Sequence, residues 1–182
     1  MKIERTRLAE VILLHPRVFS DERGWFYESF NEVAFANSTA CDVRFVQDNH
    51  SRSSEGVLRG LHFQLPPYAQ GKLVRVVQGR VFDVAVDIRR SSATFGQWVA
   101  AELSEANRCQ LWIPAGFAHG FLALSDGAEV LYKSTDRWEA SAERSIAWND
   151  ASIGIEWPTT QLPQLSAKDA VAPRLSEVAV FD

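Results

Sequence analysis

The segment that begins at Gly56 carries the spacing of a metal site in a β-barrel, but two of the usual metal ligands are replaced. Such sites have five residues between a glycine and a His-x-His pair, and six residues between a glutamate and a second glycine. Here Gly56 and His62 keep the first spacing, Gln64 replaces the second histidine, and Lys72 replaces the glutamate with six residues between it and Gly79. Because an ammonium group at that place repels cations, we expect no metal. The pocket is expected to work through acid–base chemistry and positive charge.

Short β-type segments dominate the chain of 182 residues. Runs of β-branched and aromatic residues closed by turn residues occur at 11–14, 24–30, 72–77, 80–88, 97–103, 110–113, 120–124 and 128–134. Regularly spaced short strands favour a sandwich or barrel, and helical periodicity is limited to short stretches near 30–34 and 166–171. Gly and Pro are not gathered at a boundary. We therefore expect residues 1–182 to form one mainly β domain with short peripheral helices.

Residues 72–88 are predicted to form a hairpin, because a Gln-Gly dipeptide separates the two runs as a two-residue turn. This register would set Val74 opposite Asp83, and alternation would place Lys72 and Asp83 on one face. That face is either exposed to solvent or lines a polar pocket, and the neighbouring basic residues favour the pocket. The other face is wholly apolar and is expected to pack on another sheet: it holds Phe82, Val84, Val86 and Ile88.

A second histidine motif follows at residues 114–121, where Pro-x-Gly-x-x-His ends in His119. A tight turn that leads into a strand would present His119 beside His62 at the mouth of a barrel. A lone histidine is more often a structural side chain, but two histidines at the spacings of one barrel pattern favour a shared site.

Charge and cysteine content limit the partners and the location. The net charge of −4 argues against nucleic acid and anionic membrane surfaces as partners. The N-terminal region has no apolar run long enough for a signal or membrane segment. Cys41 and Cys109 lack the spacing of a zinc finger or redox motif, so two reduced thiols are favoured over a single disulfide. We expect a cytoplasmic, unexported protein.

A resemblance to a known family rests on segments that are distributed over nearly the whole chain: 19–28, 47–51, 56–64, 70–75, 84–89, 113–121, 132–133, 146–150 and 165–169. In these segments the chain resembles the dTDP-4-dehydrorhamnose 3,5-epimerases. The resemblance implies a cupin-type jelly-roll β-barrel, no cofactor, a homodimer, and a dTDP-4-keto-6-deoxyhexose as substrate. It also implies a product, dTDP-4-dehydro-L-rhamnose, that serves surface polysaccharides such as the O-antigen of lipopolysaccharide.

The resemblance also implies roles for four residues in the chemistry. The C3 and C5 protons of the sugar flank the C4 ketone and are therefore acidic enough for a positioned base to remove. His62 resembles the base, Tyr132 the acid, and Asp169 the carboxylate that orients the imidazole. Lys72 would stabilise the enolate that forms on the C4 oxygen.

Further positions match the family's substrate-binding residues. Arg23, Arg59 and Lys168 would contact the substrate, and guanidinium groups suit its phosphates. Trp138 stands where the family has a tyrosine that stacks on thymine. The remaining expected binding residues are Phe19, Glu28, Gln47, Asp48, Asn49, His119 and Glu143. The resemblance further implies that the segment around Arg23 and Glu28 serves the partner's pocket, and Asp83 is a candidate partner for His119.

Three alternatives remain open on the sequence. A monofunctional relative would invert only C3 or only C5. A metal-dependent cupin oxygenase would need a third ligand that Gln64 and Lys72 do not provide well. A catalytically silent sugar-nucleotide binding module would bind dTDP without proton exchange.

Overall fold

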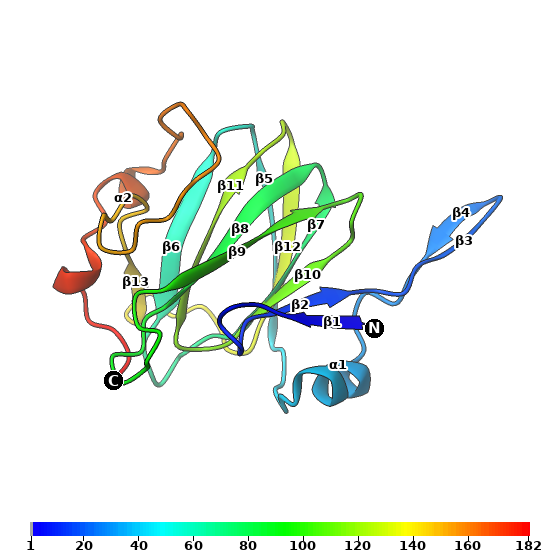
Figure 1. Ribbon diagram of the computed structural model, residues 1–182, viewed down its shortest axis with the longest axis horizontal. Coiled ribbons are helices and arrows are strands. Elements are labelled where there is room, and N and C mark those ends of the chain that lie inside the picture. Colours follow the sequence, from blue (N-terminus) through cyan, green and yellow to red (C-terminus); the bar gives the residue numbers. More distant parts are fainter. Residues whose placement is uncertain (1) are drawn as a thin grey trace.

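The computed structural model, which describes residues 2–182, contains two antiparallel sheets that pack face to face as a jelly-roll barrel (Figure 1). The six-stranded sheet has the order β1 (Lys2–Arg5), β2 (Ile12–His15), β10 (Gln110–Ile113), β7 (Lys72–Gln78), β12 (Ala128–Ser134) and β5 (Gln47–Ser53). The five-stranded sheet has the order β13 (Glu143–Ser145), β6 (Leu58–Gln64), β11 (Phe117–Ala123), β8 (Arg80–Asp87) and β9 (Trp98–Ser104). The predicted mainly β, jelly-roll fold is confirmed.

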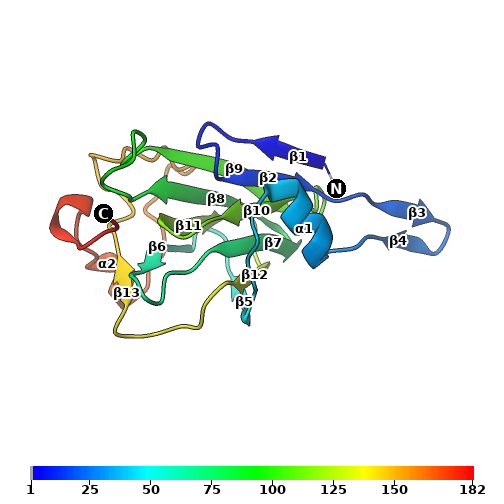
Figure 2. The ribbon, with the colours of Figure 1, turned by 90° about the horizontal axis from the view of Figure 1, so that it is seen from below.

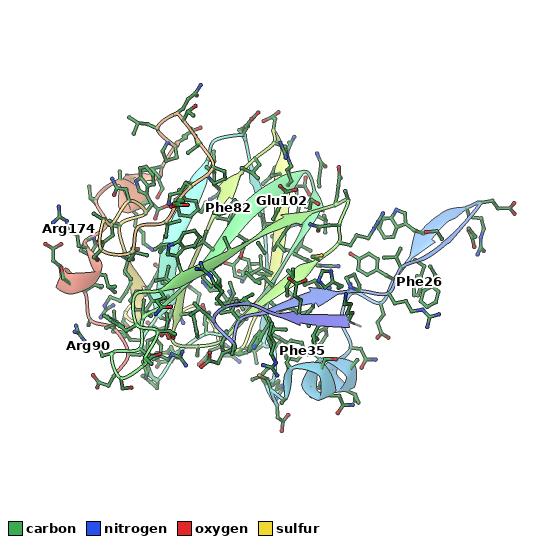
Figure 3. All side chains as sticks on the ribbon, in the orientation of Figure 1. Phe26, Phe35, Phe82, Arg90, Glu102 and Arg174 are labelled. Carbon is green, nitrogen blue, oxygen red and sulfur yellow. The ribbon has the colours of Figure 1, made fainter. Side chains whose placement is uncertain are left out.

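The remaining elements lie outside the two sheets. They are the paired strands β3 (Phe19–Asp21) and β4 (Gly24–Phe26), the helices α1 (Glu32–Thr39) and α2 (Ala167–Ala170), and a 3-10 turn at Leu175–Glu177. The β3–β4 hairpin projects from the body of the molecule in both ribbon views (Figures 1 and 2). Phe26, labelled in Figure 3, lies on this hairpin and is 69% exposed. The predicted strand at 24–30 thus ends at Phe26.

Helix α1 begins where a side chain caps its first turn. The Asn31 side chain accepts a hydrogen bond from the backbone N–H of Ala34, and the helix ends at Thr39, where the following Ala40 has a left-handed backbone. The helix places Phe35 edge-on against Trp112 of β10, with 5.2 Å between the ring centroids. This apolar cluster covers the outer face of the six-stranded sheet beside β2.

The main core fills the space between the sheets, where alternate residues of each strand point inward. The opposite face of the five-stranded sheet, which includes Val84, Val86 and Ile88, is also buried. It is covered by the C-terminal segment through Ile153 and Leu175. The prediction that this face packs on another sheet is therefore wrong.

The predicted hairpin at residues 72–88 is also wrong. Strand β7 pairs with β10 and β12, whereas β8 pairs with β11 and β9 in the other sheet. The chain turns at Gly79, where φ is +70°, and crosses from one sheet to the other. Val74 and Ala85 still belong to the same core cluster between the two sheets. The face assignments are right although the pairing is not.

The structure also bears on the expectations for the cysteines and for membrane segments. Cys41 and Cys109 are both free, so the disulfide alternative is excluded. None of the helices that residues 2–182 form is long and apolar enough to cross a membrane.

Candidate functional site

A cavity of about 460 Å³ lies between the two sheets, against the C-terminal segment. Strands β5, β6, β7, β11 and β12 and residues 164–169 supply its walls. The cavity brings together side chains that the sequence places up to 118 residues apart. Its lining includes these predicted site residues: Arg59, His62, Lys72, His119, Tyr132 and Asp169.

A β-bulge in β6 allows two of these side chains to line the same cavity. Arg59 pairs with Phe121 of β11 and His62 pairs with His119, so β6 has one residue more than its partner between the pairs. Gly60 lies in the bulge with φ of +125°, and a Cβ atom there would stand 2.6 Å from the Cα of Gly120. Without the bulge, strand alternation would turn Arg59 and His62 to opposite faces.

His62 is paired with the carboxylate of Asp169. His62 Nε2 lies 2.6 Å from Oδ1 of Asp169, and the Asp169 side chain is almost fully buried. Burial alone would raise the pKa of Asp169, but the hydrogen bond and charge of His62, with further hydrogen bonds from Ser166 and Gly60, hold this pKa below its usual value. The ionised carboxylate fixes the imidazole and leaves its other nitrogen to accept a proton.

Lys72 and Tyr132 lie on neighbouring strands of the opposite sheet. The Lys72 Nζ lies 5.8 Å from the centroid of the Tyr132 ring. Burial lowers the pKa of Lys72 to about 8, although the charges of Asp83 and Glu143 oppose the shift. Burial and the charge of Glu143 raise the pKa of Tyr132 against the opposing charge of Arg59, so the phenol keeps its proton at neutral pH.

His119 forms the predicted pair with Asp83. Its Nε2 lies 2.9 Å from Oδ2 of Asp83, and both side chains are buried. The two residues stand on adjacent strands, β11 and β8. The carboxylate therefore fixes the orientation of a second imidazole in the cavity wall.

Of the predicted binding residues, Arg59, Lys72 and His119 line the cavity, whereas Gln47, Asn49, Trp138, Glu143 and Lys168 are held by contacts outside its lining. Glu143 and Lys168 form an ion pair of 2.7 Å, and the Nε of Arg59 donates to the Ser53 hydroxyl at 3.0 Å. On β5, the Gln47 amide nitrogen donates to Asn49 at 2.9 Å. The backbone N–H of Trp138 donates to the Gln47 side chain at 2.9 Å.

The structure does not bring every predicted binding residue to this cavity. The carboxylate of Asp48 is exposed and pairs with Lys133 at 2.9 Å, because alternation along β5 turns it away from its inward-facing neighbours. The residues Phe19, Arg23 and Glu28 belong to the projecting hairpin and its base, and Arg23 is paired with Asp21 at 2.6 Å.

Ser51 and Gln164 are among the lining residues that were not predicted as site residues. Ser51 continues the alternation of Gln47 and Asn49, which could have identified it, and its buried hydroxyl has no hydrogen-bond partner within residues 2–182. Gln164 lies in an irregular segment without any periodic signal, where its carbonyl accepts from the N–H of Leu58 at 3.0 Å. In the described part of the chain, no group of three or more His, Cys, Asp or Glu residues is placed to hold a metal ion.

Comparisons with known proteins agree on one family. A family model described as dTDP-4-dehydrorhamnose 3,5-epimerase matches residues 5–177. The dTDP-4-dehydrorhamnose 3,5-epimerase of Salmonella typhimurium is 59% identical over 182 residues, which cover 100% of both chains.

Solved structures give the same result. The dTDP-6-deoxy-D-glucose-3,5-epimerase of Legionella pneumophila, in complex with dTDP-4-keto-L-rhamnose, has a TM-score of 0.95 and 49% identity, covering 98% of this chain and 94% of that one. A 3'-monoepimerase from Streptomyces bikiniensis, in complex with dTDP-quinovose, has a TM-score of 0.89 and 31% identity, covering 94% and 87%.

Proposed function

Because the chain belongs to the dTDP-4-dehydrorhamnose 3,5-epimerase family, we propose that it inverts C3 and C5 of dTDP-4-dehydro-6-deoxy-D-glucose to give dTDP-4-dehydro-L-rhamnose. The observation that carries this proposal is the placement of the His62–Asp169 pair in one cavity with Lys72 and Tyr132. These groups can remove a proton, stabilise the resulting negative charge and return a proton.

The two sheets supply the base and the acid from different walls of the cavity. His62 comes from β6 of the five-stranded sheet, and Tyr132 comes from β12 of the six-stranded sheet. A sugar ring between them would lose a proton to the imidazole on one face and receive a proton from the phenol on the other. Reprotonation from the opposite face is what inverts a carbon centre.

Lys72 would stabilise the enolate that forms when the base removes the proton. Its ammonium group is buried, and a charge in a site that excludes water acts more strongly on a developing oxyanion than a charge in water does. Removing one such donor typically costs about 100-fold to 1,000-fold in kcat. Lys72 therefore supplies the positive charge that a metal ion brings to enolates in other enzymes.

We propose that the active form is a homodimer in which the β3–β4 hairpin reaches the partner's cavity. The hairpin projects from the molecule and exposes Phe19, Trp25 and Phe26, which is costly for a monomer in water. Arg23 and Glu28, expected to bind substrate, would then serve the partner subunit. Arg59 and Lys168 would supply cationic charge for the diphosphate from the chain's own cavity.

The proposal also includes three expectations that come from the sequence and the family. They are a single domain over residues 1–182, a cytoplasmic location, and a role of the product in surface polysaccharide. The two free thiols support the cytoplasmic location.

Solvent deuterium exchange tests the reaction directly. Enzyme and dTDP-4-dehydro-6-deoxy-D-glucose are incubated in heavy water, and label at each sugar carbon is measured by NMR. Deuterium is expected at both C3 and C5 with wild-type protein. His62→Ala should abolish exchange at both carbons, whereas His50→Ala, a control on the outer face of β5, should retain it. Absence of label at both carbons with wild-type protein would refute the proposal.

A second candidate function is a monofunctional epimerase, because a 3'-monoepimerase shares this fold at a TM-score of 0.89. The same experiment separates the two functions. Label at only one of the two carbons, with accumulation of the singly inverted product, would favour this candidate.

A further inference from the structure

Gln64 occupies the position of a metal ligand in related barrels, but its side chain binds backbone groups of two loops. It is 3% exposed, and its Nε2 donates to the carbonyls of Tyr68 at 2.6 Å and Arg137 at 3.0 Å. Its Oε1 accepts a hydrogen bond from the backbone N–H of Glu139 at 2.8 Å. Both amide hydrogens are therefore used, and the side chain ties the loop after β6 to residues 137–139.

A second glutamine holds the residue between those two contacts. The backbone N–H of Trp138 donates to Oε1 of Gln47 on β5, at 2.9 Å. Three successive residues, 137 to 139, are thus each held through the backbone by a glutamine side chain. The two glutamines come from different sheets. We name this arrangement the glutamine clamp.

The residue that the clamp holds is an exposed aromatic. The Trp138 side chain is 58% exposed, and its ring is absent from the apolar clusters. Each hydrogen bond of the clamp contributes roughly 1 kcal/mol, and a loop held by several of them loses little further freedom when a ligand binds. An indole fixed in this way suits the stacking of a flat ligand group, which is worth about 1–3 kcal/mol for a nucleotide base.

We propose that Gln64 is a positioning residue for Trp138 and fixes the indole in place for the base of the nucleotide substrate. This inference rests on the proposed function, because it takes the ligand to be a thymidine nucleotide. Gln64 acts through the backbone of residues 137 and 139, so its contribution to binding depends on the indole of Trp138. Catalysis by His62 and Tyr132 does not depend on the clamp.

A double-mutant cycle on dTDP affinity tests the inference, with the dissociation constant measured by calorimetry. Trp138→Ala is expected to weaken dTDP binding about tenfold or more, since it removes the stack. Gln64→Met preserves side-chain length but removes all three hydrogen bonds, and should weaken binding about fivefold. In the Trp138→Ala background, Gln64→Met should change the affinity less than about twofold, because coupled residues are not additive. With the sugar-nucleotide substrate, the loss caused by Gln64→Met should appear mainly as a raised KM rather than as a lowered kcat.

Two further variants make the test specific. Asn107→Leu also removes three hydrogen bonds between a side chain and the backbone, but in the turn between β9 and β10, away from the cavity. It should leave dTDP affinity unchanged even where it lowers stability. Gln64→Glu retains the acceptor for Glu139 and loses both donors, and it replaces Gln64→Met in the cycle if the methionine variant does not fold.

The outcomes distinguish this inference from the proposed function. If wild-type protein shows deuterium exchange and binds dTDP, but the Gln64 variant weakens binding equally with and without the indole, the positioning role is refuted. Unchanged affinity in the Gln64 variant also refutes it. If wild-type protein neither binds dTDP nor exchanges deuterium, the proposed function itself fails.

Discussion

At the scale of single residues, Lys72 is the group whose environment most alters its chemistry. The folded protein holds its proton less tightly than the unfolded chain, since burial moves the pKa from 10.5 to about 8. The buried ammonium therefore costs stability below about pH 8, and this cost disappears as the pH rises toward 10.5. A residue retained at a cost to stability is best explained by a role in the cavity.

The shifted pKa predicts how activity depends on pH. If the protonated Lys72 stabilises the enolate, kcat/KM should fall above about pH 8, the pKa of this residue in the free enzyme. Tyr132 does not account for that limb, because its pKa lies above its usual value of 10.0. The measurement is a profile of kcat/KM between pH 6 and 10, a range that brackets the Lys72 pKa of about 8.

A charge-retaining variant is the control for this profile. Lys72→Arg should lose activity through altered geometry, but the remaining activity should persist to higher pH, because a guanidinium group stays protonated. A wild-type profile that stays flat beyond pH 9, about one unit above that pKa, would contradict the assigned role of Lys72.

At the scale of elements, the bulge in β6 depends on one glycine. Gly60→Ala should lower the free energy of unfolding by about 3 kcal/mol or more, because a Cβ adds backbone strain at a φ of +125° and a steric conflict with Gly120. Gly154→Ala is the matched control, since its φ of +66° is also positive but a Cβ there meets open space apart from a carbonyl at 3.9 Å. It should cost only about 1 kcal/mol. Denaturant unfolding measures both, and equal losses would refute the steric argument.

Most strands were predictable from the sequence, but their pairing was not. The alternation of β7 and β8 correctly placed Val74 and Ala85 in the interior. A Gln-Gly turn is compatible with a hairpin and with a crossing between sheets, and only the packing of distant strands decides between them. The direction of Asp48 was not predictable for the same reason, because it depends on the pairing of β5 with β12.

The candidate site was predictable mainly because sequence motifs identified residues that lie far apart along the chain. The contact between His62 and Asp169 joins residues 107 positions apart, and no local pattern predicts it. The resemblance to a family supplied that pair. Gln164 was missed because irregular segments have no periodicity.

At the scale of the whole molecule, the proposed exchange of hairpins predicts complementation between inactive subunits. Arg23→Ala removes a group that would serve the partner's cavity, and His62→Ala removes a group of the chain's own cavity. Each variant alone should have little activity. Mixing equal amounts after unfolding and refolding should restore about a quarter of wild-type activity, because about half of the dimers are mixed and each holds one intact site.

In the control mixture, both variants are defective in the chain's own cavity. His62→Ala mixed with Tyr132→Phe combines two changes in the chain's own cavity and should restore no activity, since each cavity then retains a defect. Absence of recovery in the Arg23→Ala mixture, with dimers present by light scattering, would show that Arg23 does not serve the partner subunit.

The contact between His62 and Asp169 also has a consequence for synthesis of the protein. During translation, the strands of both sheets are made before the segment that carries Asp169. Except for the short β13, these strands are complete more than 30 residues before Asp169. The carboxylate that orients His62 is therefore synthesised only after the strands of both sheets. We expect proton abstraction by His62 to require the completed C-terminal segment.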